Sequence, residues 1–400
     1  MNSAQQPSSQ GNPTPRKDVP AFLTHGFRPF FLGAGLLASL AILFWMARYA
    51  GVMAYETYFP AAAWHSHEML FGFSSAVIAG FLLTAVPNWT GCAHLKGPLL
   101  AAFFAIWFAG RVLMWAPVFV PGVVIMATDV LFVALLIAWL AKAIWKARAV
   151  RNAIFILLVS FLLVASFLDH AAALGWVTDG HRIAQDLGLG TVILLIVIVG
   201  GRVIPAFTQN ALAAKGIKVR EGSKLDALAI IASALAGGIE VFWPGSIASG
   251  VAFLFAAVCV GGRMWGWRTL STISSPILWV LHLAYLWVVA GLAFKGGAYF
   301  VDIIPRSTAL HALTAGAIGT MTLAMMTRAA LGHTGRPLKA PFMIAVGYGL
   351  VSFAAVMRIG SGLAQGEAFL IIIIISGCLW SLAFLIFSVV YWPILTRPRN

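Results

Sequence analysis

The side chains best suited to chemistry in this 400-residue chain are histidines that lie close to acidic residues within long apolar segments. Two of them lie in Trp64-His65-Ser66-His67-Glu68, His170 directly follows Asp169, and His181 and His311 each lie near the start of a further apolar segment. Neutral imidazole is the commonest protein ligand for haem iron and also suits copper. A nearby carboxylate can hold the second ring nitrogen in the required tautomer. These residues therefore predict a metal or haem site.

The spacing within the first histidine motif predicts two different environments. On an α-helix His65 and His67 point about 200° apart, so we expect one of them to bind a group that the other does not reach. His65 and Glu68, three residues apart, share a face. Glu68 is then expected either to support His65 or to carry protons, and the alternative is a hydrogen-bonded structural carboxylate.

The predicted site consists of imidazoles, carboxylates and guanidinium groups from several segments. We expect cofactor binding by His65, His67, His170 and His311, and metal ligation by His65, His67, His181 and His311. Proton transfer or support of a ligand is expected of Glu68, Asp129, Asp169 and Asp186. Candidate contacts for an anion or for haem propionates are Arg111, Arg182, Arg202 and Arg306. Alternatively, the acids pair with these arginines, or the arginines extend to the membrane interface.

Composition shows what must position these residues. The chain is 61% hydrophobic and 10% charged, whereas soluble domains carry about 25% charged residues. A transmembrane helix needs roughly 20 mostly apolar residues to cross a bilayer core about 30 Å thick. Twelve such segments are expected, at 28–50, 62–86, 98–116, 121–145, 151–175, 182–207, 225–243, 246–264, 275–296, 307–330, 341–362 and 368–392. The sequence thus predicts an all-α, multi-pass membrane protein in a lipid bilayer.

The distribution of basic residues predicts the orientation of these segments, because Lys and Arg are retained on the cytoplasmic side. With both termini in the cytoplasm, 20 of the 26 basic residues fall on that side. The remaining six are Arg48, Arg111, Arg182, Lys295, Arg306 and Arg358. The histidines of the predicted site then lie near the outer ends of their segments. His94 and His333 lie on the inner side, and His282, at a different depth, is expected to be structural.

Composition also predicts the domain organisation. Residues 1–21, rich in Ser, Gln, Asn, Gly and Pro, are expected to form a disordered cytoplasmic tail, and residues 22–396 a single transmembrane domain. The net charge of +14 arises from short clusters between apolar segments, so no nucleic-acid partner is expected. Because no CxxCH motif occurs, any haem would be held non-covalently, as in b-type haem proteins.

Several stretches resemble one known family. They are Gly26-Phe27-Arg28-Pro29-Phe30-Phe31, Trp64-His65-Ser66-His67-Glu68-Met69-Leu70-Phe71-Gly72-Phe73, Ala79-Gly80-Phe81-Leu82-Leu83-Thr84-Ala85-Val86-Pro87-Asn88-Trp89-Thr90-Gly91, Gly201-Arg202-Val203-Ile204-Pro205-Ala206-Phe207-Thr208 and His311-Ala312-Leu313-Thr314-Ala315-Gly316. Together they resemble the NnrS family, from about residue 22 to residue 395, and the second stretch is the most specific.

The resemblance implies a protein of the bacterial inner (cytoplasmic) membrane that contains haem iron and copper. It also implies a role in denitrification and in tolerance of nitric oxide, or nitrosative stress. It supplies neither a ligand set nor a reaction. Haem-copper oxidases also use twelve helices with histidines near the outer face, but this chain has no adjacent His-His pair, which argues against oxidase-like reduction of dioxygen or nitric oxide.

Three functions are therefore compatible with the sequence. The leading hypothesis is a haem- and copper-binding protein that protects against nitric oxide, either by redox chemistry at the haem or by limiting attack on iron centres. The partner would then be nitric oxide or another small diatomic ligand, with an electron donor that the sequence does not identify. The second hypothesis is a proton-coupled secondary transporter of a small solute. The third is an assembly or sensory protein whose metal site is structural.

Overall fold

The computed structural model describes residues 19–115, 119–220, 222, 224–301 and 305–398. Twelve helical spans within these ranges are long and apolar enough to cross a membrane. The described residues contain no β-strand. The predicted all-α, multi-pass fold is therefore confirmed. Residues 1–18 of the predicted tail lie outside the described residues, and a short 3-10 turn begins at Ala21.

Ten of the twelve spans contain one α-helix that covers all or most of the span, and two are divided by a π-helical segment. The helices are α1 (Phe27–Tyr49), α2 (Ala61–His67), α3 (Ser74–Thr90), α4 (Pro98–Trp115), α5 (Gly122–Lys146), α6 (Ala153–Ala173), α7 (Gly180–Leu212), α8 (Lys224–Phe242), α9 (Ile247–Met264), α10 (Pro276–Gly297), α11 (Arg306–His311), α12 (Thr320–His333), α13 (Phe342–Gly360) and α14 (Gly366–Thr396). The π-helical segment η2 (Glu68–Phe73) joins α2 to α3, and η7 (Ala312–Gly319) joins α11 to α12.

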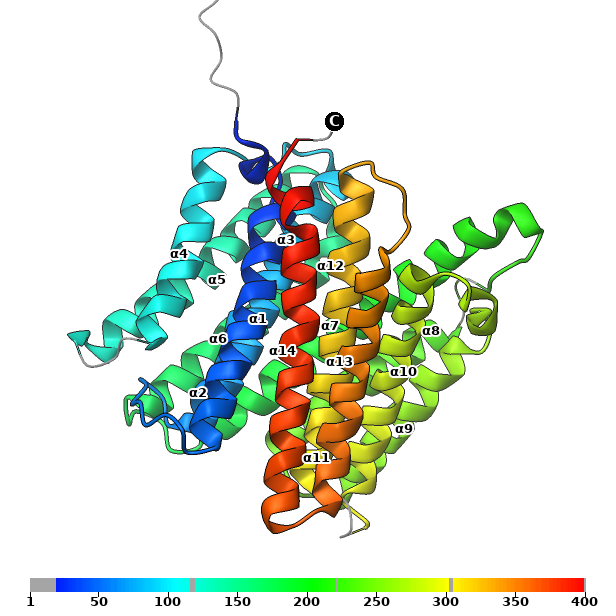
Figure 1. Ribbon diagram of the computed structural model, residues 1–400. Helices are drawn as coiled ribbons and strands as arrows, with labels where there is room; N and C mark the ends of the chain where they lie inside the picture. Colours follow the sequence, from blue (N-terminus) through cyan, green and yellow to red (C-terminus); the bar gives the residue numbers. More distant parts are fainter. Residues whose placement is uncertain (1–18, 116–118, 221, 223, 302–304, 399–400) are drawn as a thin grey trace, which may run out of the picture.

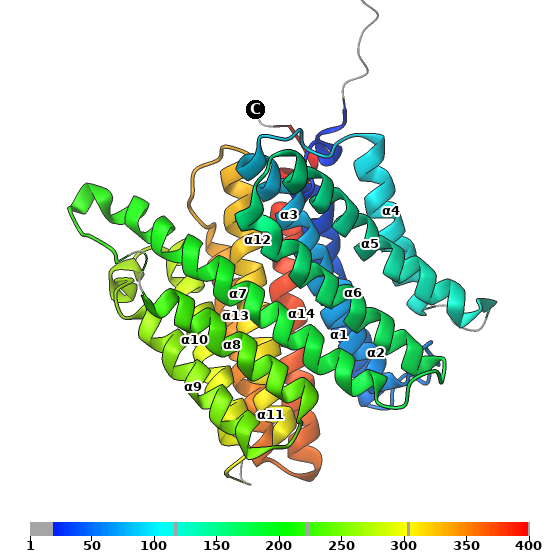
Figure 2. The same cartoon turned by 180° about the vertical axis from the view of Figure 1, so that it is seen from behind.

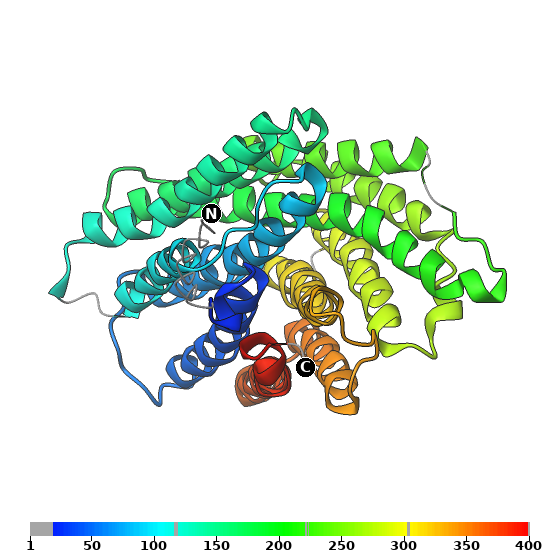
Figure 3. The ribbon, with the colours of Figure 1, turned by 90° about the horizontal axis from the view of Figure 1, so that it is seen from above.

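The helices form an elongated bundle. Helix α14 lies between α1 and α13 and packs against both, while α4 with α5 and α8 with α9 lie at opposite edges (Figures 1 and 2). Seen from above, α5 to α8 form a broad rear layer behind α1, α12, α13 and α14 (Figure 3). The described parts of the two chain ends lie on the same side (Figure 1). We call that side the inner end, on the basis of the predicted orientation, and the opposite side the outer end.

Four spans are more buried than the others, and they form the centre of the bundle. They are Phe27–Tyr49, Ala61–Thr90, Gly180–Lys215 and Arg306–His333. Small residues permit close packing here: Gly80 lies against the ring of Phe31, and Gly188 lies against the ring of Phe71. These four spans carry most of the predicted site, so the fold places it in the interior of the bundle.

The predicted boundaries agree with the helices to within four residues, with one exception. The exception is the segment predicted at 182–207, because α7 continues through Pro205 to Leu212. Proline removes one helical hydrogen bond, which membrane helices tolerate when nearby side chains satisfy the backbone. The carbonyl that lacks its backbone donor here is that of Gly201, four residues before Pro205.

Candidate functional site

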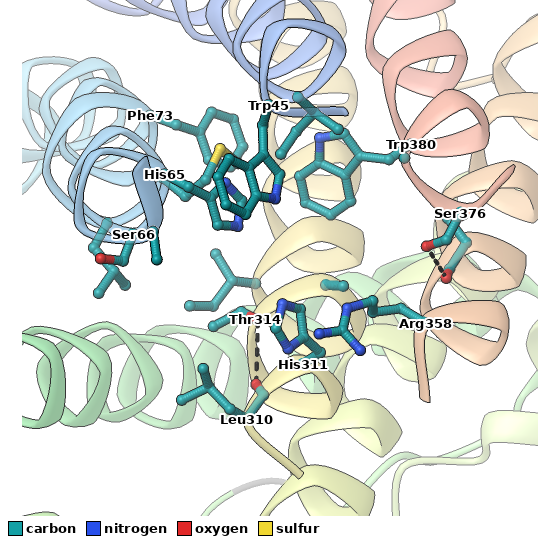
Figure 4. Close-up of a pocket in the computed structure, with 18 of the residues that line it drawn as sticks. Trp45, His65, Ser66, Phe73, Leu310, His311, Thr314, Arg358, Ser376 and Trp380 are labelled. Atoms are coloured by element: carbon teal, nitrogen blue, oxygen red, sulfur yellow. Dashed lines mark hydrogen bonds between the residues drawn. The ribbon is translucent and has the colours of Figure 1, made fainter. Parts of the chain in front are cut away.

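A cavity of about 320 Å³ lies in the outer half of the bundle. We call it the outer cavity, and its walls come from α1, α2, η2, the start of α3, α7, α11, η7, α13 and α14. The imidazoles of His65 and His311 both line it, together with Trp45, Arg358 and Trp380 (Figure 4). Its volume falls at the lower end of the range for small-molecule and cofactor sites, about 300–1,000 Å³. The structure therefore brings two of the predicted imidazoles to one cavity.

The ring of His65 is held by stacking. It lies parallel to the indole of Trp45, with ring centroids 5.0 Å apart and an interplanar angle of 7°. Among the described residues, no hydrogen-bond partner is found for either ring nitrogen of His65. Either ring nitrogen can therefore carry the proton, and the other nitrogen presents its lone pair to a ligand in the cavity without competition from the protein.

The ring of His311 is oriented by the backbone. Its Nδ1 lies 2.6 Å from the carbonyl oxygen of Ser307, one turn earlier in α11. Since a carbonyl can only accept, Nδ1 carries the proton and Nε2 presents its lone pair. A hydrogen bond of this kind fixes the tautomer and raises the basicity of a ligating imidazole. His311 is thus better prepared to bind a metal than His65.

The two histidines of the outer cavity share a local backbone feature. His311 immediately precedes η7, and His65 lies three residues before η2. Residues of both π-helical segments line the cavity, including Met69 and Thr314. Such segments are rare and occur frequently at functional sites. This recurrence supports the outer cavity as a candidate functional site on grounds independent of its side chains.

A second group of polar residues lies on the other face of α2, and we call it the polar cluster. His67 Nδ1 lies 2.8 Å from Asp169 Oδ2, and His67 Nε2 lies 3.2 Å from Asp129 Oδ2. His170 Nε2 approaches the same Asp129 oxygen at 3.3 Å. Arg111 donates to Glu68 at 2.8 Å and also contacts Asp129. His67, Glu68, Asp169 and His170 are fully buried, and Arg111 and Asp129 are 4% exposed.

The polar cluster contains more acidic than basic charge. Glu68, Asp129 and Asp169 supply three carboxylates, and Arg111 supplies one guanidinium. If all three carboxylates are ionised, the cluster lacks two positive charges. Buried charge without compensation is strongly unfavourable, most of all at membrane depth. Two protonated imidazoles or one divalent cation would supply the missing charge.

Three side chains of the polar cluster are arranged as metal ligands. One ligand atom each from His67, Asp129 and His170 lies within 4.8 Å of the others. If the Nδ1 of His67 donates to Asp169, its Nε2 is free to coordinate a metal ion, which is the common carboxylate–histidine–metal arrangement. Two imidazoles and a carboxylate suit copper, zinc or iron. The arrangement is that of a candidate metal site.

An aromatic lid separates the polar cluster from the outer surface. The ring of Phe59 lies 4.6 Å from His67, 5.3 Å from His170 and 5.7 Å from His181, centroid to centroid. The hydroxyl of Tyr58 lies 3.5 Å from His170 Nδ1. Burial and the charge of Asp169 raise the pKa of Tyr58 to about 12, so this hydroxyl stays protonated at neutral pH. The loop between α1 and α2 thus covers the cluster with a ring and a neutral polar group.

The remaining predicted site residues lie outside both groups or at their edges. His181 is partly exposed and its Nδ1 lies 2.6 Å from Asp169 Oδ1, at the rim of the polar cluster. Asp186 pairs with Arg182 at 3.4 Å and with Lys295 at 3.8 Å. Arg202 is exposed, and Arg306 lies over the ring of Tyr299. Neither lines the outer cavity or joins the polar cluster.

For two residues the structure matches the alternative interpretation. Glu68 pairs with Arg111 at 2.8 Å, as expected of a hydrogen-bonded structural carboxylate. Arg111 also contacts Asp129, so it pairs with acidic residues, which was the alternative to an anion or propionate contact. His282, expected to be structural, bonds Thr208 at 2.9 Å and Thr269 at 3.0 Å. That expectation agrees with the structure.

A family model described as NnrS protein matches residues 21–399. This match covers nearly the whole chain. The chain belongs to the NnrS family. A search of curated proteins found no match for the sequence. The motif resemblance in the sequence is thereby confirmed, and the two groups of residues above are groups within an NnrS-family fold.

The sequence of this NnrS-family protein did not reveal two residues of the outer cavity. Arg358 lines the cavity, and its Nη1 donates to Ser361 at 3.0 Å. In the sequence, Arg358 stood out only as one of six basic residues on the outer side. His311 was expected on the same side, and this common depth was the available signal. Trp45, which stacks on His65, carried no signal because aromatic residues are common at membrane interfaces.

Proposed function

We propose that this NnrS-family protein holds haem in the outer cavity and copper in the polar cluster, and that it protects a bacterial cell against nitric oxide. The observation that carries the proposal is the pair His65 and His311, which line one cavity from separate helices with ring nitrogens free for a ligand. The bacterial inner membrane is the proposed location, because the twelve spans require a bilayer and the family resemblance implies that membrane.

The residues of the outer cavity fit haem by their chemistry. Imidazole nitrogen is a common axial ligand of haem iron, and the aromatic side chains of Trp45, Phe73 and Trp380 give the cavity flat apolar walls (Figure 4). Arg358 adds a fixed positive charge suited to a propionate carboxylate. Haem would be held without a covalent link, because the sequence has no CxxCH motif.

The two imidazoles would have unequal roles. His311, whose Nδ1 proton is held by a carbonyl, would be the strong and permanent ligand. His65, which is held by stacking alone, would be weak and exchangeable. Haem iron with an exchangeable position supplies binding of small diatomic ligands such as nitric oxide.

The residues of the polar cluster fit copper. His67 and His170 supply nitrogen ligands, and Asp129 supplies an oxygen ligand. A divalent ion would also supply the two positive charges that the cluster lacks. Because His65 and His67 are two residues apart on α2, the two proposed sites would be linked by a single turn of helix.

The decisive experiment is haem and metal analysis of the purified full chain, with optical spectra before and after addition of nitric oxide. We expect stoichiometric haem, bound copper, and a Soret band that shifts with nitric oxide. Folded protein without stoichiometric haem would end the proposal. Haem that does not react with nitric oxide would favour an assembly or sensory role. Solute flux in proteoliposomes that persists without metal, after replacement of His65, His67 and His311, would favour a transporter.

A further inference from the structure

A second, smaller cavity of about 80 Å³ lies below the outer cavity, towards the inner end. We call it the apolar cavity. Its walls come from α1, α3, α7 and α12, and they include Val77, Val192, Leu195 and Met321. Ser74, the first residue of α3, lines both cavities. The two cavities are therefore neighbours, separated at one point by a serine side chain.

The walls of the apolar cavity offer no free side-chain donor to a water molecule. Its two side-chain hydroxyls are already bonded to the backbone: Ser74 donates to the carbonyl of Met69 at 2.8 Å, and Thr322 donates to that of Ile318 at 2.7 Å. All other lining side chains are apolar. A water molecule needs two to four polar partners, and apolar cavities of this kind remain dry and bind xenon or small apolar molecules. The volume suits an atom or a diatomic molecule and excludes a larger cofactor.

The apolar cavity also faces the lipid. Ile78, Phe81 and Met325 line it and are only partly buried, although they lie well inside their spans. At this depth the surroundings are hydrocarbon rather than water. Since apolar gases partition into hydrocarbon, a gas molecule can pass between these side chains without crossing a polar layer.

We propose that the apolar cavity binds one molecule of an apolar gas taken up from the bilayer and passes it, beside Ser74, to the outer cavity. The identity of the natural gas as nitric oxide rests on the proposed function. The affinity of the cavity for an apolar gas does not, because it follows from the dry apolar walls and the volume alone.

The test uses xenon as the probe and needs no haem. Crystals of the full chain are pressurised with xenon, and anomalous scattering locates the bound atoms. We expect a xenon atom between Val77, Val192 and Met321. Val192→Phe, which fills the cavity, should abolish this peak. Val192→Ala, which enlarges the cavity, and Val258→Phe, on a side chain 72% exposed on α9, should both retain it.

A wild-type crystal with xenon elsewhere in the protein but none in the apolar cavity would overturn the proposal, and so would an ordered water molecule there. Because this result is read from the wild-type protein, it holds even if Val192→Phe fails to fold.

The passage step has its own readout, which is the rebinding of carbon monoxide after photolysis from haem-loaded protein. Val192→Phe should slow it several-fold, and unchanged kinetics in a variant that has lost xenon would overturn that step. A protein without haem would overturn the proposed function and leave the xenon result intact.

Discussion

The imidazole Nδ1 of His67 lies 2.8 Å from Oδ2 of Asp169, and both side chains are fully buried. Asp169 also accepts from His181, so one carboxylate serves two rings. The pair fixes the orientation of His67 towards Asp129 and His170. Whatever ion the polar cluster binds, this contact sets how well His67 is placed to bind it.

Replacing Asp169 should therefore weaken metal binding without removing a ligand. Partners of this kind typically change metal affinity by about 10–100-fold, and we expect a loss in this range for Asp169→Asn. Competition with a chelator of known copper affinity measures it. Asp186→Asn is the matched control, because Asp186 pairs with Arg182 and Lys295 outside the cluster. Equal copper affinity in both variants would contradict the assigned role.

Replacing Arg111 should destabilise the fold. The guanidinium is 4% exposed and contacts both Glu68 and Asp129. Removing one partner of a buried ion pair costs about 3–5 kcal/mol, because the remaining charge is left uncompensated. We expect such a loss for Arg111→Met, measured by unfolding in mixed detergent micelles. The exposed Arg202→Met is the control, expected within about 0.5 kcal/mol of wild type.

A double variant sharpens this prediction. Glu68→Gln removes one of the carboxylates that Arg111 neutralises. In the background of Arg111→Met it should recover part of the lost free energy of unfolding, because one fewer buried charge remains. If the two changes simply add, the destabilisation arises from lost packing and the charge argument fails.

The two histidines of the outer cavity should give different spectra when replaced. His311→Phe should lose haem, because it removes the better oriented ligand. His65→Phe should retain haem but shift its optical spectrum, because one imidazole that would contact the haem is lost. His94→Phe, on the inner side, should leave the spectrum unchanged. Equal loss of haem in the two cavity variants would refute the unequal roles.

His25 should make stability depend on pH. Burial, then the nearby charges of His94 and Arg28, lower the pKa of His25 from 6.5 to about 4. The unfolded chain therefore binds the proton first as pH falls, so the contribution to stability is complete above about pH 6.5 and is lost as pH falls towards 4. Between about pH 7 and pH 4.5 the melting temperature should fall further for the wild type than for His25→Gln, which lacks this titrating group. Parallel curves would refute this.

Hydropathy and periodicity predict much of this architecture. The twelve spans follow from the length of their apolar runs, because a bilayer of fixed thickness imposes that length. The separation of His65 from His67 follows from the helical angle alone. The structure confirms that separation, since His65 lines the outer cavity and His67 lies in the polar cluster.

Contacts between helices could not be predicted in the same way. The choice of Asp129 and Asp169 as partners of His67 depends on how α5 and α6 pack against α2, and a single sequence holds no direct record of packing. The role of Arg358 was missed for the same reason, because its span lies in sequence far from His65. The π-helical segments gave no signal, since their composition is as apolar as that of the α-helices around them.

The two π-helical segments also allow one span to present side chains to a site and to pack against neighbouring helices. A π-helical turn accommodates extra chain within a helix, so it shifts the angular phase of everything that follows. Side chains before Glu68 can then face a ligand, while those of Ser74–Thr90 pack against the neighbouring helices. Deleting a single residue between Glu68 and Phe73 would remove the extra residue that the wide turn accommodates and leave an unbroken α-helix. The helix would keep its packing but lose the local widening that brings Met69, Leu70 and Phe73 to the wall of the outer cavity.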